Sequence, residues 1–367
     1  MLIDLDNPLS VATLCNEVKG EREAIVREVF PLPDVTGHSG GDRAYAHEVV
    51  VPYVLAAPLR TPANVHPREA PQHPREARSI PPGGEWLFVK LYTGSAESDN
   101  VLRSLIRPFV AAMRESGLIS SWFFIRYADP DTHLRIRFRG APSALAGEVL
   151  PQLRQWCIPW FADRRIWRIQ CDTYEREIER YGGVEATGLA EALFAADSDA
   201  VLAILNDSQG AGGGVRRDLA AHLGVDRLLA DAGLAINERR RLMLASDRLQ
   251  AAYAKPERRH AYGTAYREFR KELEPGVLLL ESAPDVASLP PTQRALVERS
   301  RCTRPILGEA SALFRTRGNL TGWDDALLSY AHMHLNRIRR LRDIDTEAKV
   351  YDHLARCYQS LDARRAV

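Results

Sequence analysis

The spacing of apolar residues divides the chain into a mixed first half and a helical second half. Apolar and polar residues alternate, or β-branched and aromatic residues gather, in four segments that predict strands: 86–94, 121–129, 133–140 and 166–175. Between them, 98–117 and 144–163 repeat their apolar residues every three to four positions, which predicts two helices, the first bent at Pro108 and the second interrupted by Pro151 and Pro159.

After Gly183 the helical period continues to the end of the chain. Helices are expected over seven segments: 187–205, 215–231, 236–253, 259–274, 290–314, 323–342 and 346–362. Because strands and helices come first and helices alone follow, the order indicates an α+β fold rather than a doubly wound parallel sheet. We expect an antiparallel or mixed sheet packed with helices, followed by an all-helical half.

The first 84 residues differ from this main domain, which we place at 85–367. Residues 1–56 contain a helical spacing from Pro8 to Val29 and an edge-strand pattern at 42–56, but they are too short to fold alone. Residues 57–84 carry seven prolines between positions 58 and 82 and the repeated sequence HPREA. This composition predicts an extended, semi-rigid linker.

Composition excludes several classes of protein. With 45% apolar and 26% charged residues the chain is neither disordered nor fibrous. It has no run of 18 apolar residues and no signal-peptide pattern, so we expect a cytoplasmic protein without a membrane segment. The five cysteines show no zinc-binding spacing, which favours free thiols in a reducing compartment and no metal site.

Arginine is strongly preferred over lysine. Of 49 basic residues 44 are Arg. Codon bias in a GC-rich genome would explain this preference, and so would a need for planar groups that bind carboxylates. Because 48 acidic residues offset them and leave a net charge of +1, the chain as a whole is not a general binder of polyanions.

The segment 133–140 places arginines along one face of a strand. Leu134, Ile136 and Phe138 point to one side, and the other side carries four polar residues: His133, Arg135, Arg137 and Arg139. Neighbouring side chains on that face are about 7 Å apart. Such a face is either a solvated surface or a cationic recess for carboxylates or phosphate.

Two further segments concentrate ionisable groups. DTYEREIERYGG (172–183) is either a surface ladder of salt bridges or part of a site. In the helix 327–342, His332 and His334 are two apart and form a poor metal pair, whereas His332 and Asn336 share a face. His332 is therefore either a structural histidine or a general acid or base.

Taken together, these segments resemble a known family. WLFVKLYTG (86–94), WFFIRYADPDTHLRIRFRG (122–140), DTYEREIERYGG and SYAHMHLNR (329–337) occur in the order found in the C-terminal, SpaB-C-like elimination domain of LanB-type lantibiotic dehydratases. The resemblance covers residues 85–367. In addition, GDRAYAHEVVVPYVL (41–55) resembles the end of the preceding glutamylation domain, so residues 1–56 look like a remnant of it.

The resemblance implies one half of a split dehydratase, as in thiopeptide-type bacteriocin biosynthesis. A separate enzyme would transfer glutamate from glutamyl-tRNA to Ser or Thr of a precursor peptide. This chain would then eliminate glutamate and leave dehydroalanine or dehydrobutyrine. The resemblance implies that the chain needs no cofactor and contacts neither a membrane nor nucleic acid. It is also compatible with a homodimer.

The resemblance also implies the residues of the site. His332 would shuttle the Cα proton, and Arg137 and Arg176 would hold the carboxylates of the glutamyl adduct. Four others are expected to bind substrate: Arg135, Arg126, Lys90 and Asn336. These types suit the chemistry, because guanidinium groups bind carboxylates through two hydrogen bonds and stabilise developing negative charge.

Two other functions remain open. Pyridine synthases of thiopeptide pathways share this domain type and perform a [4+2] cycloaddition with loss of the leader peptide. They diverge in the arginine strand and the histidine helix, both of which this sequence retains. A non-catalytic subunit that presents the precursor peptide is the other alternative.

Overall fold

The computed structural model describes residues 8–17, 19, 73–210, 212–282, 285–317, 322–339 and 344–365. The chain divides into two units, residues 1–67 and 68–367. Within the first unit the structure describes the helix α1 (Pro8–Glu17) and Lys19. The predicted strand at 42–56, the helical pattern beyond Lys19 and the linker up to residue 72 lie outside the described residues.

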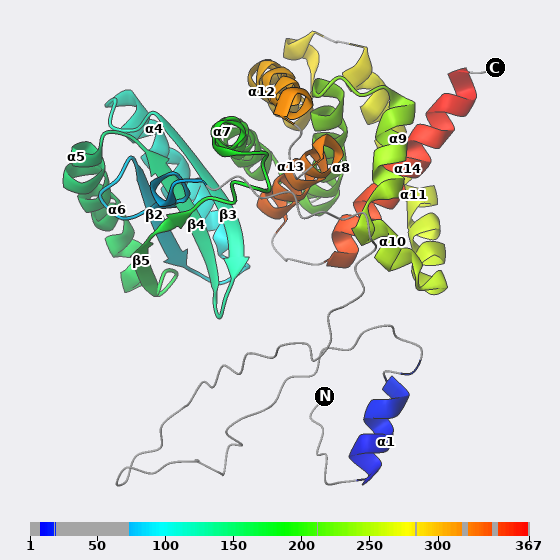
Figure 1. Cartoon of the computed structure of the whole chain (residues 1–367), viewed down its shortest axis with the longest axis horizontal. Helices are drawn as coiled ribbons and strands as arrows, with labels where there is room; N and C mark the ends of the chain where they lie inside the picture. The colour runs from blue at the N-terminus through cyan, green and yellow to red at the C-terminus, as the bar shows by residue number, and fades with distance from the viewer. Residues whose placement is uncertain are drawn as a thin grey trace. The chain divides into compact units, whose positions relative to one another are not determined.

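A four-stranded antiparallel sheet forms the first half of the main unit (Figure 1). Its spatial order is β3-β4-β2-β5, built from β2 (Trp86–Tyr92), β3 (Ser121–Ala128), β4 (Thr132–Arg139) and β5 (Arg168–Asp172). Helical segments connect β2 to β3 and β4 to β5, which gives the split βαββαβ arrangement. The first connection comprises α3 (Ser98–Val101), the π-helical turn η1 (Leu102–Ile106) and α4 (Arg107–Glu115). The second comprises α5 (Pro142–Ala144), the π-helical turn η2 (Leu145–Val149) and α6 (Leu150–Ala162).

The two faces of this sheet have different roles. Leu134, Ile136 and Phe138 of β4 are buried, and Phe138 meets Phe109 of α4 edge to face with ring centroids 5.6 Å apart. The apolar face therefore packs against the connecting helices, as the alternation predicts. The opposite face carries the arginines of β4.

Part of the predicted linker is folded onto the main unit. Residues 75–80 form α2 (Arg75–Arg78) and β1 (Ser79–Ile80), and β1 pairs antiparallel with β6 (Tyr174–Glu175). The side chain of Ile80 is buried there, and Arg78 forms an ion pair with Glu179. Within the expected linker, residues 75–78 are thus helical rather than extended, and residues 79–80 are an extended strand held by pairing with β6 and by the burial of Ile80.

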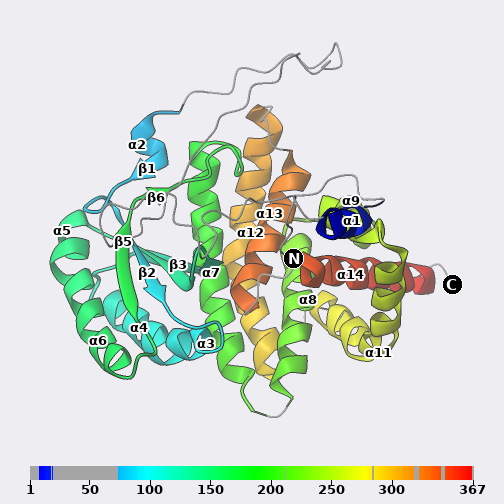
Figure 2. The same ribbon diagram turned by 90° about the horizontal axis from the view of Figure 1, so that it is seen from below.

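The second half consists of helices in the described part of the chain (Figure 2). They are α7 (Val184–Asp207), α8 (Gly213–Asp231), α9 (Ile236–Ala245), α10 (Asp247–Tyr253), α11 (Pro256–Glu281), the 3₁₀ turn η3 (Val286–Ser288), α12 (Pro291–Arg317), α13 (Trp323–Ile338) and α14 (Ile344–Arg365). The expected α+β class is confirmed. The single helix expected at 236–253 is two helices, because Ser246 adopts extended backbone angles between them.

Two of these helices join the halves. α7 packs against β3 on one side and against α12 on the other, and α13 also contacts β3. Between them, the buried Asp197 of α7 accepts hydrogen bonds from Arg299 of α12 (2.7 Å) and Arg337 of α13 (3.1 Å) and lies 2.8 Å from Nδ1 of His334. Gly224 of α8 is required here, because a Cβ at this position would lie 2.0 Å from Nε2 of His334.

None of the described helices is long and apolar enough to cross a lipid bilayer. All five cysteines are free in this structure.

Candidate active site

The register of the sheet surrounds Arg137 with aromatic rings. Arg137 lies opposite Phe88 of β2 and Phe123 of β3, which places all three side chains on one face. The guanidinium carbon is 4.3 Å from the Phe88 ring centroid and 5.1 Å from that of Phe123. Tyr174 of β6 adds a third ring at 4.5 Å. We call these three rings and Arg137 the aromatic box.

The box encloses the positive charge of Arg137. Arg137 is only 6% exposed, and within the described residues its Nε and Nη1 atoms have no hydrogen-bond partner. Burial lowers the pKa of Arg137 to about 10, so the group remains a cation at neutral pH. A buried cation with unused donors is costly to keep, and such groups concentrate at functional sites. The unused donors of Arg137 give the box the chemistry to bind an anion.

Arg176 lies beside the box and is held by an acidic residue. Its Nε and Nη2 donate to the two carboxylate oxygens of Glu191 at 2.7 and 2.9 Å, and its Nη2 is 3.6 Å from Glu85. Burial and the neighbouring Glu191 charge raise the pKa of Tyr174, so its hydroxyl stays protonated. The structure thus brings Arg137 and Arg176 together, but the carboxylate-binding fork of Arg176 is occupied by Glu191.

Arg135 and Lys90 lie further along the same sheet face. Arg135 stacks on the ring of Tyr127 at 3.4 Å and donates from Nε to His133 at 3.1 Å. Lys90 is opposite Arg135 in the register and forms an ion pair with Asp172. Both cations therefore extend the positive face that begins at Arg137.

Two of the expected substrate-binding residues make structural contacts. Arg126 is buried, and its guanidinium donates to Ser98, to Asp99 and to the carbonyl oxygen of Arg337. Asn336 of α13 accepts from the backbone N–H of Arg126 and donates to its carbonyl oxygen, both at 2.9 Å. These contacts fasten α13 to β3 and leave neither group directed at a ligand.

His332 lies on α13, on the helix face that it shares with Ser329 and Asn336. Its Nδ1 is 2.8 Å from a carboxylate oxygen of Glu347 in α14, and within the described residues Nε2 makes no hydrogen bond. Glu347 also accepts from Tyr351 at 2.8 Å and pairs with Arg248 at 3.1 Å. With Nδ1–H donating to Glu347, Nε2 carries the lone pair that a general base needs.

The electrostatics of Glu347 fit this role. Burial acts to raise the pKa of Glu347, but the hydrogen bond to His332 and the charge of Arg248 outweigh burial and hold that pKa below the usual range. The residue is therefore an anion at neutral pH, placed to orient the His332 ring. The other histidine of this helix, His334, is fully buried against Asp197.

Sequence reasoning missed several members of this region. Glu347 and Glu191 come from helices distant in sequence, although Glu191 interrupts the apolar run of α7 and could have been noticed. The sequence places Arg180 within the charged segment 172–183 and gives no sign of its contacts. It donates to Ser329, one turn before His332 on α13, and to Glu177. Among the described residues, no group of His, Cys, Asp and Glu side chains could hold a metal ion.

Comparison with known proteins identifies the family. A model of the family described as lantibiotic biosynthesis dehydratase C-term matches residues 86–358, most of the chain. The chain belongs to this family. It is 26% identical to the subtilin biosynthesis protein SpaB of Bacillus subtilis, over all of this chain and 34% of that protein. It is 29% identical to the nisin biosynthesis protein NisB of Lactococcus lactis subsp. lactis, over 52% of this chain and 19% of that protein. The chain thus spans about a third of its curated relatives or less.

Solved structures share the fold. The tRNA-dependent lantibiotic dehydratase MibB of Microbispora sp. 107891 matches with a TM-score of 0.60 and 22% identity, over 77% of this chain and 29% of that chain. The pyridine synthase TbtD from thiomuracin biosynthesis matches with a TM-score of 0.54 and 17% identity, over 76% of this chain and 99% of that chain. TsrL matches with the same TM-score and 16% identity, over 76% of this chain and 95% of that chain.

Proposed function

We propose that this member of the lantibiotic dehydratase family eliminates glutamate from glutamylated Ser or Thr side chains of a precursor peptide. The observation that carries the proposal is Arg137, a buried cation with unused donors in the aromatic box. Glutamate transferred from its tRNA ester is linked through its α-carboxyl group, so the adduct keeps a free side-chain carboxylate, and guanidinium groups bind carboxylates through paired hydrogen bonds. Glutamylation itself would be performed by a different domain or enzyme that uses glutamyl-tRNA, and the reaction would take place in the cytoplasm.

In the proposed reaction His332 accepts the Cα proton of the modified residue at Nε2. The electrons of the broken C–H bond form the Cα–Cβ double bond, and the Cβ–O bond breaks to release glutamate as its carboxylate. Arg137 binds the adduct and stabilises the negative charge that develops on the leaving group. Arg176 adds positive charge beside it while Glu191 holds its guanidinium, and Arg135 and Lys90 extend the same positive face.

Glutamate release tests the proposal directly. A chemically glutamylated peptide is incubated with the protein, and mass spectrometry follows stepwise loss of glutamate. Arg137→Lys should slow this loss about 10²–10³-fold, because an ammonium group cannot supply two coplanar donors between the rings. Arg139→Lys is the matched control, since Arg139 lies on the same face of β4 but is exposed and paired with Glu85. Equal rates for Arg137→Lys and Arg139→Lys would contradict the assignment of Arg137.

The shared fold with the pyridine synthase TbtD supports a second candidate, cycloaddition of two dehydroalanines. A dehydrated peptide serves as the alternative substrate in the same assay. Loss of the leader from that peptide, without glutamate loss from the first, would replace elimination by cycloaddition. No mass change on either substrate would favour a non-catalytic subunit that presents the precursor.

A further inference from the structure

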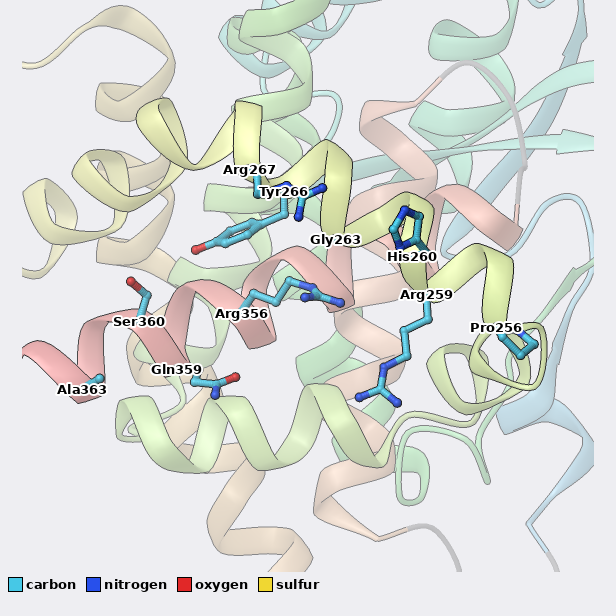
Figure 3. Close-up of a pocket in the computed structure, with 10 residues that line it drawn as sticks. All are labelled: Pro256, Arg259, His260, Gly263, Tyr266, Arg267, Arg356, Gln359, Ser360 and Ala363. Atoms are coloured by element: carbon cyan, nitrogen blue, oxygen red, sulfur yellow. The ribbon is translucent and has the colours of Figure 1, made fainter.

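A cavity of about 800 Å³ lies between α11 and α14, in the helical half of the main unit (Figure 3). Figure 2 shows that these two helices lie at the far side of the helical half from the sheet. Four of its lining residues are basic and none is acidic: Arg259, His260 and Arg267 from α11, and Arg356 from α14. The cavity is therefore a positively charged groove, separate from the aromatic box.

The cations on α11 have unused donors. Arg259 and Arg267 are exposed, and within the described residues neither pairs with a carboxylate. Arg259 packs near the Tyr253 ring at 5.1 Å, and Arg267 donates to the Thr264 hydroxyl at 3.0 Å. Each guanidinium therefore retains several N–H groups for a ligand.

Arg356 is fixed in place on the opposite side of the groove. Its Nε donates to the fully buried Asp352 at 2.7 Å, and this hydrogen bond raises the pKa of Arg356. Gly263 of α11 makes room for it, because a Cβ at position 263 would lie 3.2–3.3 Å from the guanidinium. The remaining Arg356 donors thus lie close to the α11 backbone, between the two helices, as Figure 3 shows.

We propose that this groove binds a short acidic peptide segment in an extended conformation. Arg259 and Arg267 are eight residues apart on α11, a distance of about 12 Å along the helix axis. Extended carboxylates four residues apart span about 13 Å, so both arginines can pair with acidic residues at i and i+4 while Arg356 binds between them. That the segment belongs to the precursor peptide rests on the proposed function.

The lining favours a peptide over a nucleic acid. Single-stranded nucleic acid requires aromatic faces on which bases stack, together with a long basic track. The lining has one phenol ring and one imidazole: Tyr266 is buried and donates its hydroxyl to Glu274 at 2.8 Å, which leaves the small ring of His260 as the one exposed aromatic face among the lining residues. Carboxylates need only the guanidinium donors that the groove supplies.

Binding of a labelled peptide tests the groove. The probe is a fluorescent ten-residue peptide with Glu at alternate positions, and its Gln counterpart is the uncharged control; anisotropy is measured at low and moderate salt. The double variant Arg259→Glu, Arg267→Glu should bind the Glu probe at least about tenfold more weakly than the unmodified protein. The matched control is Arg107→Glu, Arg154→Glu, which makes the same charge change at exposed positions of α4 and α6.

The outcomes separate this proposal from the proposed function. Equal weakening by both double variants, or equal binding of the Gln peptide, would overturn the groove as a site for acidic peptide. Binding of poly(U) RNA that the groove variant alone abolishes, without binding of the Glu probe, would replace it by a nucleic-acid site. Glutamate release from a short glutamylated fragment without acidic residues should be unchanged in the groove variant. If no protein releases glutamate, elimination fails while the binding result stands.

Discussion

Arg137 and His332 differ in the hydrogen bonds that their side chains make in the folded chain. Arg137 is enclosed by aromatic rings, and within the described residues its Nε and Nη1 atoms make no hydrogen bond, so these donors are available to a ligand. His332 is bonded through one nitrogen to Glu347, which leaves the other nitrogen for proton transfer. In the proposed elimination Arg137 would supply positive charge and His332 a lone pair, the two contributions that such a reaction requires.

Glu347 should position the His332 ring. Glu347→Gln keeps an acceptor for Nδ1–H but removes the negative charge that stabilises the imidazolium formed after proton abstraction. We expect kcat for glutamate elimination to fall about 10- to 100-fold with little change in KM. The acid limb of the pH–rate profile should move to lower pH.

Tyr351→Phe is the control for this variant, because it removes a hydrogen bond to Glu347 and leaves the charge in place. Its pH–rate profile should match that of the unmodified protein. Thermal melting checks that both variants are folded. If Glu347→Gln lowers the melting temperature but leaves kcat and the profile unchanged, the residue is merely structural.

Residue-level prediction succeeds where the signal is local. The alternation of 133–140 was sufficient to place Arg135 and Arg137 on one face, and the register confirms that face. The partners of these groups come from distant segments, as with Glu191 and Glu347, and no local spacing encodes such contacts. Occupation of the Arg176 fork by Glu191 is likewise a property of the folded chain.

Among the helices, α13 contributes residues both to the candidate site and to the buried ion network. One side of it carries His332 and Asn336, and the other side inserts His334 and Arg337 into the ion network of Asp197. Burial acts to raise the pKa of Asp197, but His334, Arg299 and Arg337 outweigh it and hold that pKa well below the usual range. The helix is therefore fixed to α7 and α12 by an aspartate that must stay ionised.

Acid should weaken this attachment. A carboxyl group with a depressed pKa stabilises the fold above its ordinary value of about 3.9, and this contribution is lost as the pH falls further. The free energy of unfolding should therefore decrease below about pH 4. Asp197→Asn should lower the free energy of unfolding by about 3–5 kcal/mol at neutral pH. The free energy of unfolding of this variant should also change less with pH in acid.

Urea denaturation at several pH values measures both effects. Asp163→Asn is the control, because Asp163 is exposed and pairs only with Arg165 among the described residues. The free energy of unfolding of Asp163→Asn should differ from that of the unmodified protein by less than about 1 kcal/mol at neutral pH. An identical acid dependence in Asp197→Asn and the unmodified protein would contradict the role of the network.

Helix and strand positions were largely predictable, and their ends were not. The core periodicity located each strand of the larger sheet, but Pro275 did not end α11, which continues to Glu281. The break at Ser246 and the folding of residues 75–80 depend on tertiary contacts. Propensity gives way to packing at these points.

On the scale of the whole molecule, one hydrophobic core extends through the main unit. Buried residues of the sheet, such as Phe123, continue through Phe194 of α7 to Tyr330 of α13, with ring centroids 5.6 and 6.3 Å apart. The fold class was readable from the order of elements. The continuity of this core was not, because it depends on which faces of α7 and α13 meet.

The two hydrogen bonds between Asn336 and the backbone of Arg126 bear on how cooperatively the main unit unfolds. They add to the contacts of α7 and α13 with β3, an edge strand of the sheet, so we expect the two halves to unfold together. Calorimetry of the full chain should show one cooperative transition for the unfolding of residues 68–367. The calorimetric and van't Hoff enthalpies of that transition should be equal. In Asn336→Ala the two enthalpies should diverge, and a single unchanged transition would show that the core alone enforces cooperativity.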